Sequence, residues 1–148
     1  MIVTTAELLR FLRTQRLAVQ ASRAPDGAAQ AALIGIGVTD RFEIVFDTID
    51  TTRKVQNLRT SPRIALVIGG WVSGDERTVQ YEGITDEPTG SALERAKAAY
   101  FDAWPDGPSR AHWPGLIYMR VRPLWTRYSD FNQRPALIAE FQGEELGS

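Results

Sequence analysis

The first hydrophobic pattern along the chain has the period of a helix. Leu8, Phe11 and Leu12 recur at the i, i+3, i+4 spacing that places side chains on one face of an α-helix. Thr4 precedes a glutamate by three positions, which is the spacing of a capping box. The pattern predicts an amphipathic helix over residues 4–13.

The next three segments change to the period of two that is typical of strands. Residues 16–22 alternate apolar and polar side chains, residues 31–38 are more apolar, and residues 42–48 have mixed faces. Turn residues separate them, at 24–27 (Ala-Pro-Asp-Gly) and at 39–41 (Thr-Asp-Arg). Strands joined by such short turns run antiparallel, so the first half of the chain predicts a meander.

A short helix and a fourth strand follow. Residues 52–59 carry two apolar side chains three positions apart, and Asp50 or Thr51 is expected to cap this helix. Pro62 marks its end, because the residue before a proline avoids the helical conformation. The nearly continuous apolar run at residues 64–68 predicts a strand that is buried on both faces.

The remainder predicts two more strands with a helix between them. Residues 77–85 and 116–122 alternate as strands do. Between them an apolar pattern of helical period opens with a capping box at Ser91 and stops at Pro105. From Trp125 onward the chain is expected to be irregular or briefly helical.

These elements predict a mainly β (α+β) fold, a six-stranded antiparallel barrel flanked by short helices, because strands and helices do not alternate as a parallel sheet requires. The 148 residues fit a single domain, 1–148. The strands at 31–36 and 64–68 are apolar on both faces, which one small barrel cannot cover. We therefore expect an obligate homodimer in which a second copy covers the outer face.

Composition removes several classes of function. With 17 Lys and Arg against 18 Asp and Glu, the chain has no basic field for nucleic acid or an anionic membrane. It has no cysteine and a single histidine, so thiolate sites and two-histidine zinc motifs are excluded, and no metal site is predicted. No signal sequence or long apolar run is evident, which favours a cytoplasmic location.

Two other motifs carry little chemistry. The sole histidine, His112, is expected in a loop beside Trp113, where a local structural role outweighs a catalytic one. Gly35 and Gly37 resemble the start of a dinucleotide fingerprint, but the third glycine and the following helix are missing. We interpret this strand as one kept free of side chains so that a flat ligand or another strand can approach.

A candidate anion site lies where the third strand ends and the short helix begins. Hydroxyls of Thr48, Thr51 and Thr52 and the cations of Arg53 and Lys54 gather at the free amides of a helix start. Cations oppose the helix dipole there, so a bound dianion would explain their position. Solvated surface side chains would explain it equally well.

The same stretch resembles the pyridoxamine 5'-phosphate oxidase-like, FMN-binding split-barrel family. The similarity lies in a strand ending in aromatic-x-Thr (Phe46–Thr48), then Thr-Arg-Lys, then Asn-Leu, then Pro-Arg before an apolar strand. The order of elements over residues 4–131 matches as well. The resemblance implies a dimeric split barrel with FMN across the interface.

The resemblance also implies the cofactor-binding residues. These are Thr48, Thr52, Arg53 and Lys54 at the phosphate, backbone of Ala32, Leu33, Ile34, Gly35, Phe46 and Asp47 at the ring and its chain, Thr78, Val79 and Gln80 from the partner, and Trp125, Arg127 and Tyr128 near the ring.

The resemblance further implies an FMN-dependent oxidoreductase acting on a small molecule, with no catalytic side chain identified. A flavin-binding protein without turnover and a deazaflavin-dependent reductase of the same fold are the alternatives. Family members that oxidise vitamin B6 carry an arginine where this chain has Gln30-Ala31-Ala32, and an Arg-x-His where it has Arg127-Tyr128-Ser129. Pyridoxamine 5'-phosphate is therefore not the expected substrate.

Overall fold

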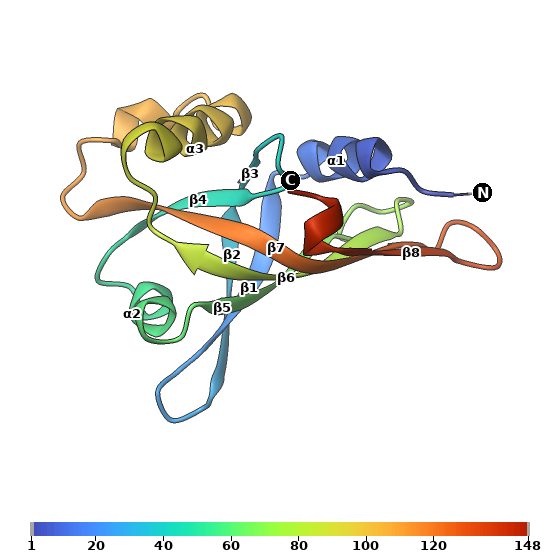
Figure 1. Cartoon of the computed structure of the whole chain (residues 1–148), viewed down its shortest axis with the longest axis horizontal. Helices are drawn as coiled ribbons and strands as arrows, with labels where there is room; N and C mark the ends of the chain where they lie inside the picture. The colour runs from blue at the N-terminus through green and yellow to red at the C-terminus, as the bar shows by residue number, and fades with distance from the viewer. Residues whose placement is uncertain (1, 148) are drawn as a thin grey trace.

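The chain folds as one curled antiparallel sheet with short helices against it (Figure 1). The structure is a computed structural model that describes residues 2–147. Its elements are α1 (Thr5–Thr14), β1 (Leu17–Arg23), β2 (Ala29–Gly35), β3 (Gly37–Val38), β4 (Ile44–Ile49), α2 (Arg53–Thr60), β5 (Arg63–Gly69), β6 (Arg77–Asp86), α3 (Gly90–Ala103), η1 (Gly107–Arg110), β7 (Leu116–Asp130), β8 (Leu137–Gln142) and η2 (Gly143–Glu145). None of the helices within residues 2–147 has the length and apolar character needed to cross a membrane.

The strand order closes the sheet on itself. Neighbouring strands run β2-β1-β5-β6-β7-β4-β3, and β8 adds to β7. The two ends of this order, β2 and β3, are consecutive in the chain and are separated only by Ile36. The sheet must therefore curl until its ends meet, which makes it a split barrel. The predicted antiparallel split-barrel fold is confirmed.

The number of strands differs from the six predicted. The predicted strand at 31–38 is divided at Ile36. The Ile36 N–H still donates to the carbonyl of Arg16 (2.9 Å), in register with the β1–β2 ladder, and pairing with β1 ends there. The second half of this segment, β3, pairs with β4 instead of β1. The other additional strand is β8.

The expectation for the tail from Trp125 onward is wrong. Instead of becoming irregular, β7 continues to Asp130, and β8 pairs antiparallel with its second half. Pro123 weakens the strand signal because proline cannot donate to a ladder. The structure accommodates Pro123 opposite Gly83, at a register shift between Glu82 and Gly83. A bulge of this kind lets one long strand pass through a proline.

The helix caps agree with the sequence at α1 only. The Thr4 hydroxyl accepts from the Glu7 N–H (3.1 Å) and the Glu7 carboxylate accepts from the Thr4 N–H (2.8 Å), so the capping box is confirmed. The predicted capping box at Ser91 is wrong, because α3 begins at Gly90 and its N-cap is Thr89, two residues before Ser91. At α2 the N-cap is Thr52, not Asp50 or Thr51.

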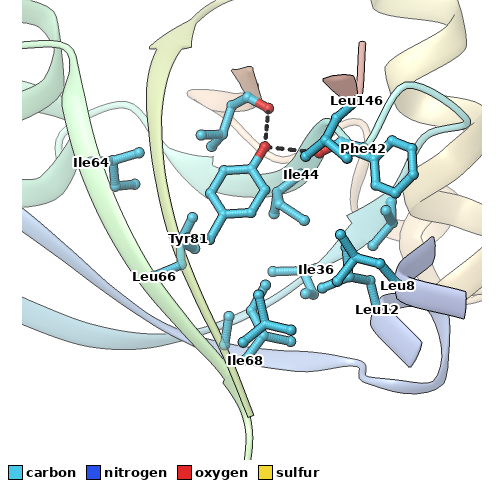
Figure 2. Packing of buried hydrophobic residues seen from close by; sticks show 14 of the residues in the cluster. Leu8, Leu12, Ile36, Phe42, Ile44, Ile64, Leu66, Ile68, Tyr81 and Leu146 are labelled. Carbon is cyan, nitrogen blue, oxygen red and sulfur yellow. Dashed lines mark hydrogen bonds between the residues drawn. The ribbon is translucent and has the colours of Figure 1, made fainter. Parts of the chain in front are cut away.

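The core lies inside the curled sheet and under α1. Buried apolar side chains from α1, α2 and every strand of the sheet meet there, including Leu8, Leu12, Ile36, Phe42, Ile44, Ile64, Leu66, Ile68, Tyr81 and Leu146 (Figure 2). Tyr81 brings a hydroxyl into this apolar space. The hydroxyl lies 2.8 Å from the carbonyl oxygen of Phe42 and 3.2 Å from that of Val121. The polar end of Tyr81 is thus satisfied by backbone, as a buried phenol requires.

The glycines flanking Ile36 are explained by α3. A Cβ on Gly37 would lie 2.6 Å from the carbonyl oxygen of Ala99, and one on Gly35 would lie 2.7 Å from the indole of Trp104. The Trp104 Nε1–H also donates to the Ile36 carbonyl (3.1 Å). The interpretation that a flat ligand or another strand approaches these glycines is wrong, since the approaching element is a helix and its C-terminal tryptophan.

We predict that Tyr81→Phe lowers the free energy of unfolding by about 1–3 kcal/mol, because two buried carbonyls lose a donor. Tyr118→Phe is the matched control. The Tyr118 hydroxyl is buried without a hydrogen-bond partner, so its removal should leave stability unchanged or increase it. Urea denaturation of both variants measures their free energies of unfolding. Equal losses of stability in the two variants would contradict a stabilising role for the Tyr81 hydroxyl.

Candidate functional site

A pocket of about 350 Å³ lies where α2 begins beside β1 and β2. Its lining residues are Gln20, Ser22, Gln30, Ala31, Ala32, Thr52, Arg53 and Lys54. The pocket exists because β2 pairs with β1 alone, which leaves the other edge of β2 unpaired and next to α2. Its volume is at the lower end of the range for small-molecule sites.

The N-terminus of α2 is suited to binding an anion. The N-cap Thr52 makes no side-chain hydrogen bond to the first-turn amides, and the first turn contains no acidic residue. The Thr52 hydroxyl instead lies 3.3 Å from that of Thr48. The free N–H groups of the first turn therefore keep their partial positive charge for a ligand.

Two cations stand in this first turn. Arg53 is exposed, whereas Lys54 is half-buried. Burial lowers the pKa of Lys54 from its ordinary value, and the nearby carboxylate of Asp47 opposes that shift. The ammonium group of Lys54 thus stands in a partly dehydrated position, where an anion would interact with it more strongly than in open water.

Asp47 is itself held in place from the α3 side. The Tyr100 hydroxyl donates to Asp47 Oδ1 (2.9 Å), and Arg110 Nε lies 3.3 Å from Oδ2. Because the Asp47 side chain is only 14% exposed, this carboxylate acts on its neighbours through little solvent. Its negative charge raises the pKa of Tyr100, together with burial, which is the larger cause. Asp47 therefore interacts both with Lys54 of α2 and with Tyr100 of α3.

The floor of the pocket is polar although it is buried. Asn57, one turn after Lys54 on α2, donates from Nδ2 to Gln30 Oε1 (2.9 Å) and to Ser22 Oγ (3.2 Å). Asn57 and Ser22 are both buried, and Gln20 lies beside them on β1. These bonds fix the helix that carries the cations against both strands of the β1–β2 hairpin.

The structure brings together part of the predicted site. Ala32, Thr52, Arg53 and Lys54 line one pocket, and Thr48 contacts it through Thr52. The side chains of Ile34, Phe46 and Val79 point into the core, so only their backbones are available to a ligand.

The other predicted residues lie elsewhere on this chain. Leu33 is 62% exposed on the outer face of β2, and Gly35 packs on Trp104. Gln80 pairs with Arg127 across β6 and β7, and Arg127 forms an ion pair with Glu140 of β8. Thr78, Trp125 and Tyr128 also stand outside the lining of the pocket.

Sequence reasoning missed four lining residues, Gln20, Ser22, Gln30 and Ala31, and the supporting residue Asn57. The available signal was polarity on a strand, since Gln20 and Ser22 share one face of residues 16–22. That signal by itself does not distinguish a solvated face from a buried polar pocket.

A family model described as pyridoxamine 5'-phosphate oxidase matches residues 4–130. The chain belongs to the pyridoxamine 5'-phosphate oxidase family. The match covers the pocket and every strand except β8. No curated protein matches the chain in sequence.

Several solved structures are similar in fold to this member of the pyridoxamine 5'-phosphate oxidase family. A heme binding protein from Mycobacterium smegmatis has a TM-score of 0.82 at 19% identity, covering 99% of this chain and 61% of its own. A pyridoxamine 5'-phosphate oxidase-related, FMN binding protein from Nostoc punctiforme has a TM-score of 0.66 at 11% identity, with 93% and 86% covered. HutZ, the heme storage protein from Vibrio cholerae, has a TM-score of 0.66 at 10% identity, with 80% and 88% covered.

The electrostatic link between Asp47 and Lys54 is testable because the chain has only two lysines, Lys54 and Lys97. We predict that Asp47→Asn lowers the pKa of Lys54 further, since it removes the charge that opposes the effect of burial. Lysine-selective NMR titration measures the pKa values of Lys54 and Lys97 in one experiment. Asp40→Asn is the control, and an unchanged or raised pKa of Lys54 in Asp47→Asn would refute the link.

Proposed function

We propose that this chain binds FMN through the pocket at the start of α2 and acts as an FMN-dependent oxidoreductase on a small-molecule substrate. The observation that carries the proposal is the joint position of Arg53, Lys54 and the uncapped first turn of α2 at one pocket. Family membership and the FMN-binding relative from Nostoc punctiforme add support.

The pocket suits a phosphate monoester. A guanidinium such as that of Arg53 presents several N–H donors in a plane, and the ammonium of Lys54 presents a compact charge. Backbone N–H groups at a helix N-terminus complete a donor set for phosphate oxygens. A dianion would also remove the cost of placing two cations at the positive end of the helix dipole.

FMN, when bound, supplies the hydride or electron transfer. The chain supplies position and environment. Arg53 and Lys54 hold the phosphate, Asp47 opposes the lowering of the Lys54 pKa by burial, and Asn57 anchors the helix that carries both cations. No side chain in this arrangement is required to act as a general acid or base.

The lining favours FMN over haem. Haem iron in proteins takes axial ligands such as His, Cys, Met or Tyr. None of the eight residues that line the pocket is of these types. His112, the only histidine of the chain, is exposed between η1 and β7 and does not line the pocket. The haem-binding relatives therefore support the fold but not the ligand.

Two alternatives share the same pocket. A flavin-binding protein without turnover would take up FMN but would not pass electrons from NAD(P)H to an acceptor. A deazaflavin-dependent reductase would yield a different pigment, which chromatography of the extracted cofactor identifies. Anaerobic reduction of the bound flavin by NADH or NADPH, followed by reoxidation, tests the oxidoreductase assignment directly.

We also infer a homodimer, and we place the chain in the cytoplasm on its composition. The outer faces of β2, β1 and β5 carry Leu33, Val19 and Val67 at directly paired positions, 62%, 36% and 45% exposed. The same cross-strand row continues to Gln80 and Arg127. If two copies paired about a two-fold axis through this patch, each would cover the apolar side chains of the other. Gln80 and Arg127 would then lie near the cofactor bound by the partner.

We predict that Arg53→Ala/Lys54→Ala weakens FMN binding by at least about 3 kcal/mol, because charge-assisted hydrogen bonds contribute about 1.5–3 kcal/mol each. Quenching of flavin fluorescence measures the affinity. Arg95→Ala/Lys97→Ala on α3 removes the same two residue types away from the pocket and should leave the affinity unchanged. Equal FMN affinities of the wild type and the α2 variant would show that Arg53 and Lys54 do not bind the phosphate.

For the homodimer, Val67→Glu should weaken self-association by at least about 3 kcal/mol, because it buries an unpaired charge in the apolar patch. Sedimentation at several concentrations measures the effect. Leu124→Glu replaces another exposed apolar side chain, at the bulge in β7, and should leave association unchanged. A folded wild-type monomer that binds FMN at full stoichiometry would refute a shared site.

A further inference from the structure

The side-chain oxygen of Gln20 lacks a hydrogen-bond partner at the floor of the pocket beside α2. Gln20 is 1% exposed and lines the pocket from β1. Its Oε1 is buried and accepts no hydrogen bond. Within residues 2–147 no side-chain hydrogen bond involves either end of this amide, although most buried polar groups in proteins are bonded.

The neighbours of Gln20 do not share this condition. Ser22 and Gln30 both accept from Asn57, so the rest of the polar floor is connected. Gln20 lies directly between Ala32 of β2 and Leu66 of β5 in the sheet, and neither side chain can bond an amide. An apolar side chain of similar length would fill the same space without the cost of an unsatisfied acceptor.

We propose that Gln20 is a specificity-determining residue whose side-chain amide hydrogen-bonds a hydroxyl on the chain attached to the bound phosphate. The ligand class is then a phosphate monoester whose attached chain carries hydroxyl groups. Arg53 and Lys54 bind its phosphate, and Gln20 binds a hydroxyl of the chain. This deepens the proposed function and rests on it where FMN, whose ribityl chain carries such hydroxyls, is the ligand.

The test separates binding from folding by using Gln20→Met, which keeps the length of the side chain and removes the amide. The melting temperature of the ligand-free variant should rise, because a buried unpaired acceptor is gone. The dissociation constant for FMN should increase about tenfold, which corresponds to about 1.4 kcal/mol. The dissociation constant for inorganic phosphate should not change.

Gln56→Met, on the exposed side of α2, is the matched control and should bind FMN as wild type does. If Gln20→Met does not fold, Gln20→Asn withdraws the amide by one methylene and should show the same selective loss. An unchanged FMN affinity overturns the inference, whatever the melting temperature. An equal loss for FMN and inorganic phosphate overturns it too, because Gln20 would then act on the phosphate clamp.

Failure of the FMN proposal is distinguishable from failure of this inference. If the wild-type protein takes up no FMN, ribose 5-phosphate and inorganic phosphate are compared as stabilising ligands in thermal unfolding. Ribose 5-phosphate should raise the melting temperature more in the wild type, and the difference should disappear in Gln20→Met. Equal shifts from the two ligands in the wild type would overturn the role of Gln20.

Discussion

At Ile36 the chain stops pairing with β1 and begins, one residue later, to pair with β4. The N–H of Ile36 bonds the carbonyl of Arg16, and its carbonyl accepts from the indole of Trp104. One residue thus ties the start of β1, the end of α3 and both ends of the sheet together. On the β2 side of this point, β2 pairs with β1 alone, and its Gln30 is bonded to Asn57 of α2. The pocket lies where β1, β2 and the start of α2 meet.

Close packing on the other side of Ile36 makes this geometry rigid. Helix α3 approaches so closely at Gly37 that no larger residue fits without displacement of the helix backbone. The same helix carries Tyr100, which holds Asp47 on β4. The barrel closure and the electrostatic environment of Lys54 therefore depend on one helix-to-sheet contact, although α3 itself does not line the pocket.

Sequence patterns predicted elements better than faces. The alternation in residues 16–22 identified β1 correctly, but an apolar-inward reading would bury Val19 and expose Gln20, and the structure does the reverse. Periodicity fixes which side chains share a face, and the burial of that face depends on partners that the local sequence does not contain. The place of Pro123 within β7 likewise depends on a distant partner, since the bulge that accommodates it lies opposite Gly83, forty residues earlier.

In the candidate site, too, the local sequence predicted some residues, whereas others depend on distant partners. Arg53 and Lys54 were predictable because the cations and the helix start are contiguous in sequence. The floor was not, since Asn57 reaches residues 27 and 35 positions away. Only tertiary structure reveals that a buried asparagine and a strand glutamine belong to one pocket.

Strand β1 carries two surfaces on one backbone: Ala18, Gln20 and Ser22 face inward, while Val19 and Ala21 face outward. An insertion or deletion of a single residue before Val19 would exchange the two sets, since side chains alternate along a strand. The pocket floor would become aliphatic and the apolar outer patch would become polar in the same event. We therefore expect β1 to tolerate substitutions but no change of length, whereas the turn at residues 25–27 can lengthen without shifting either face.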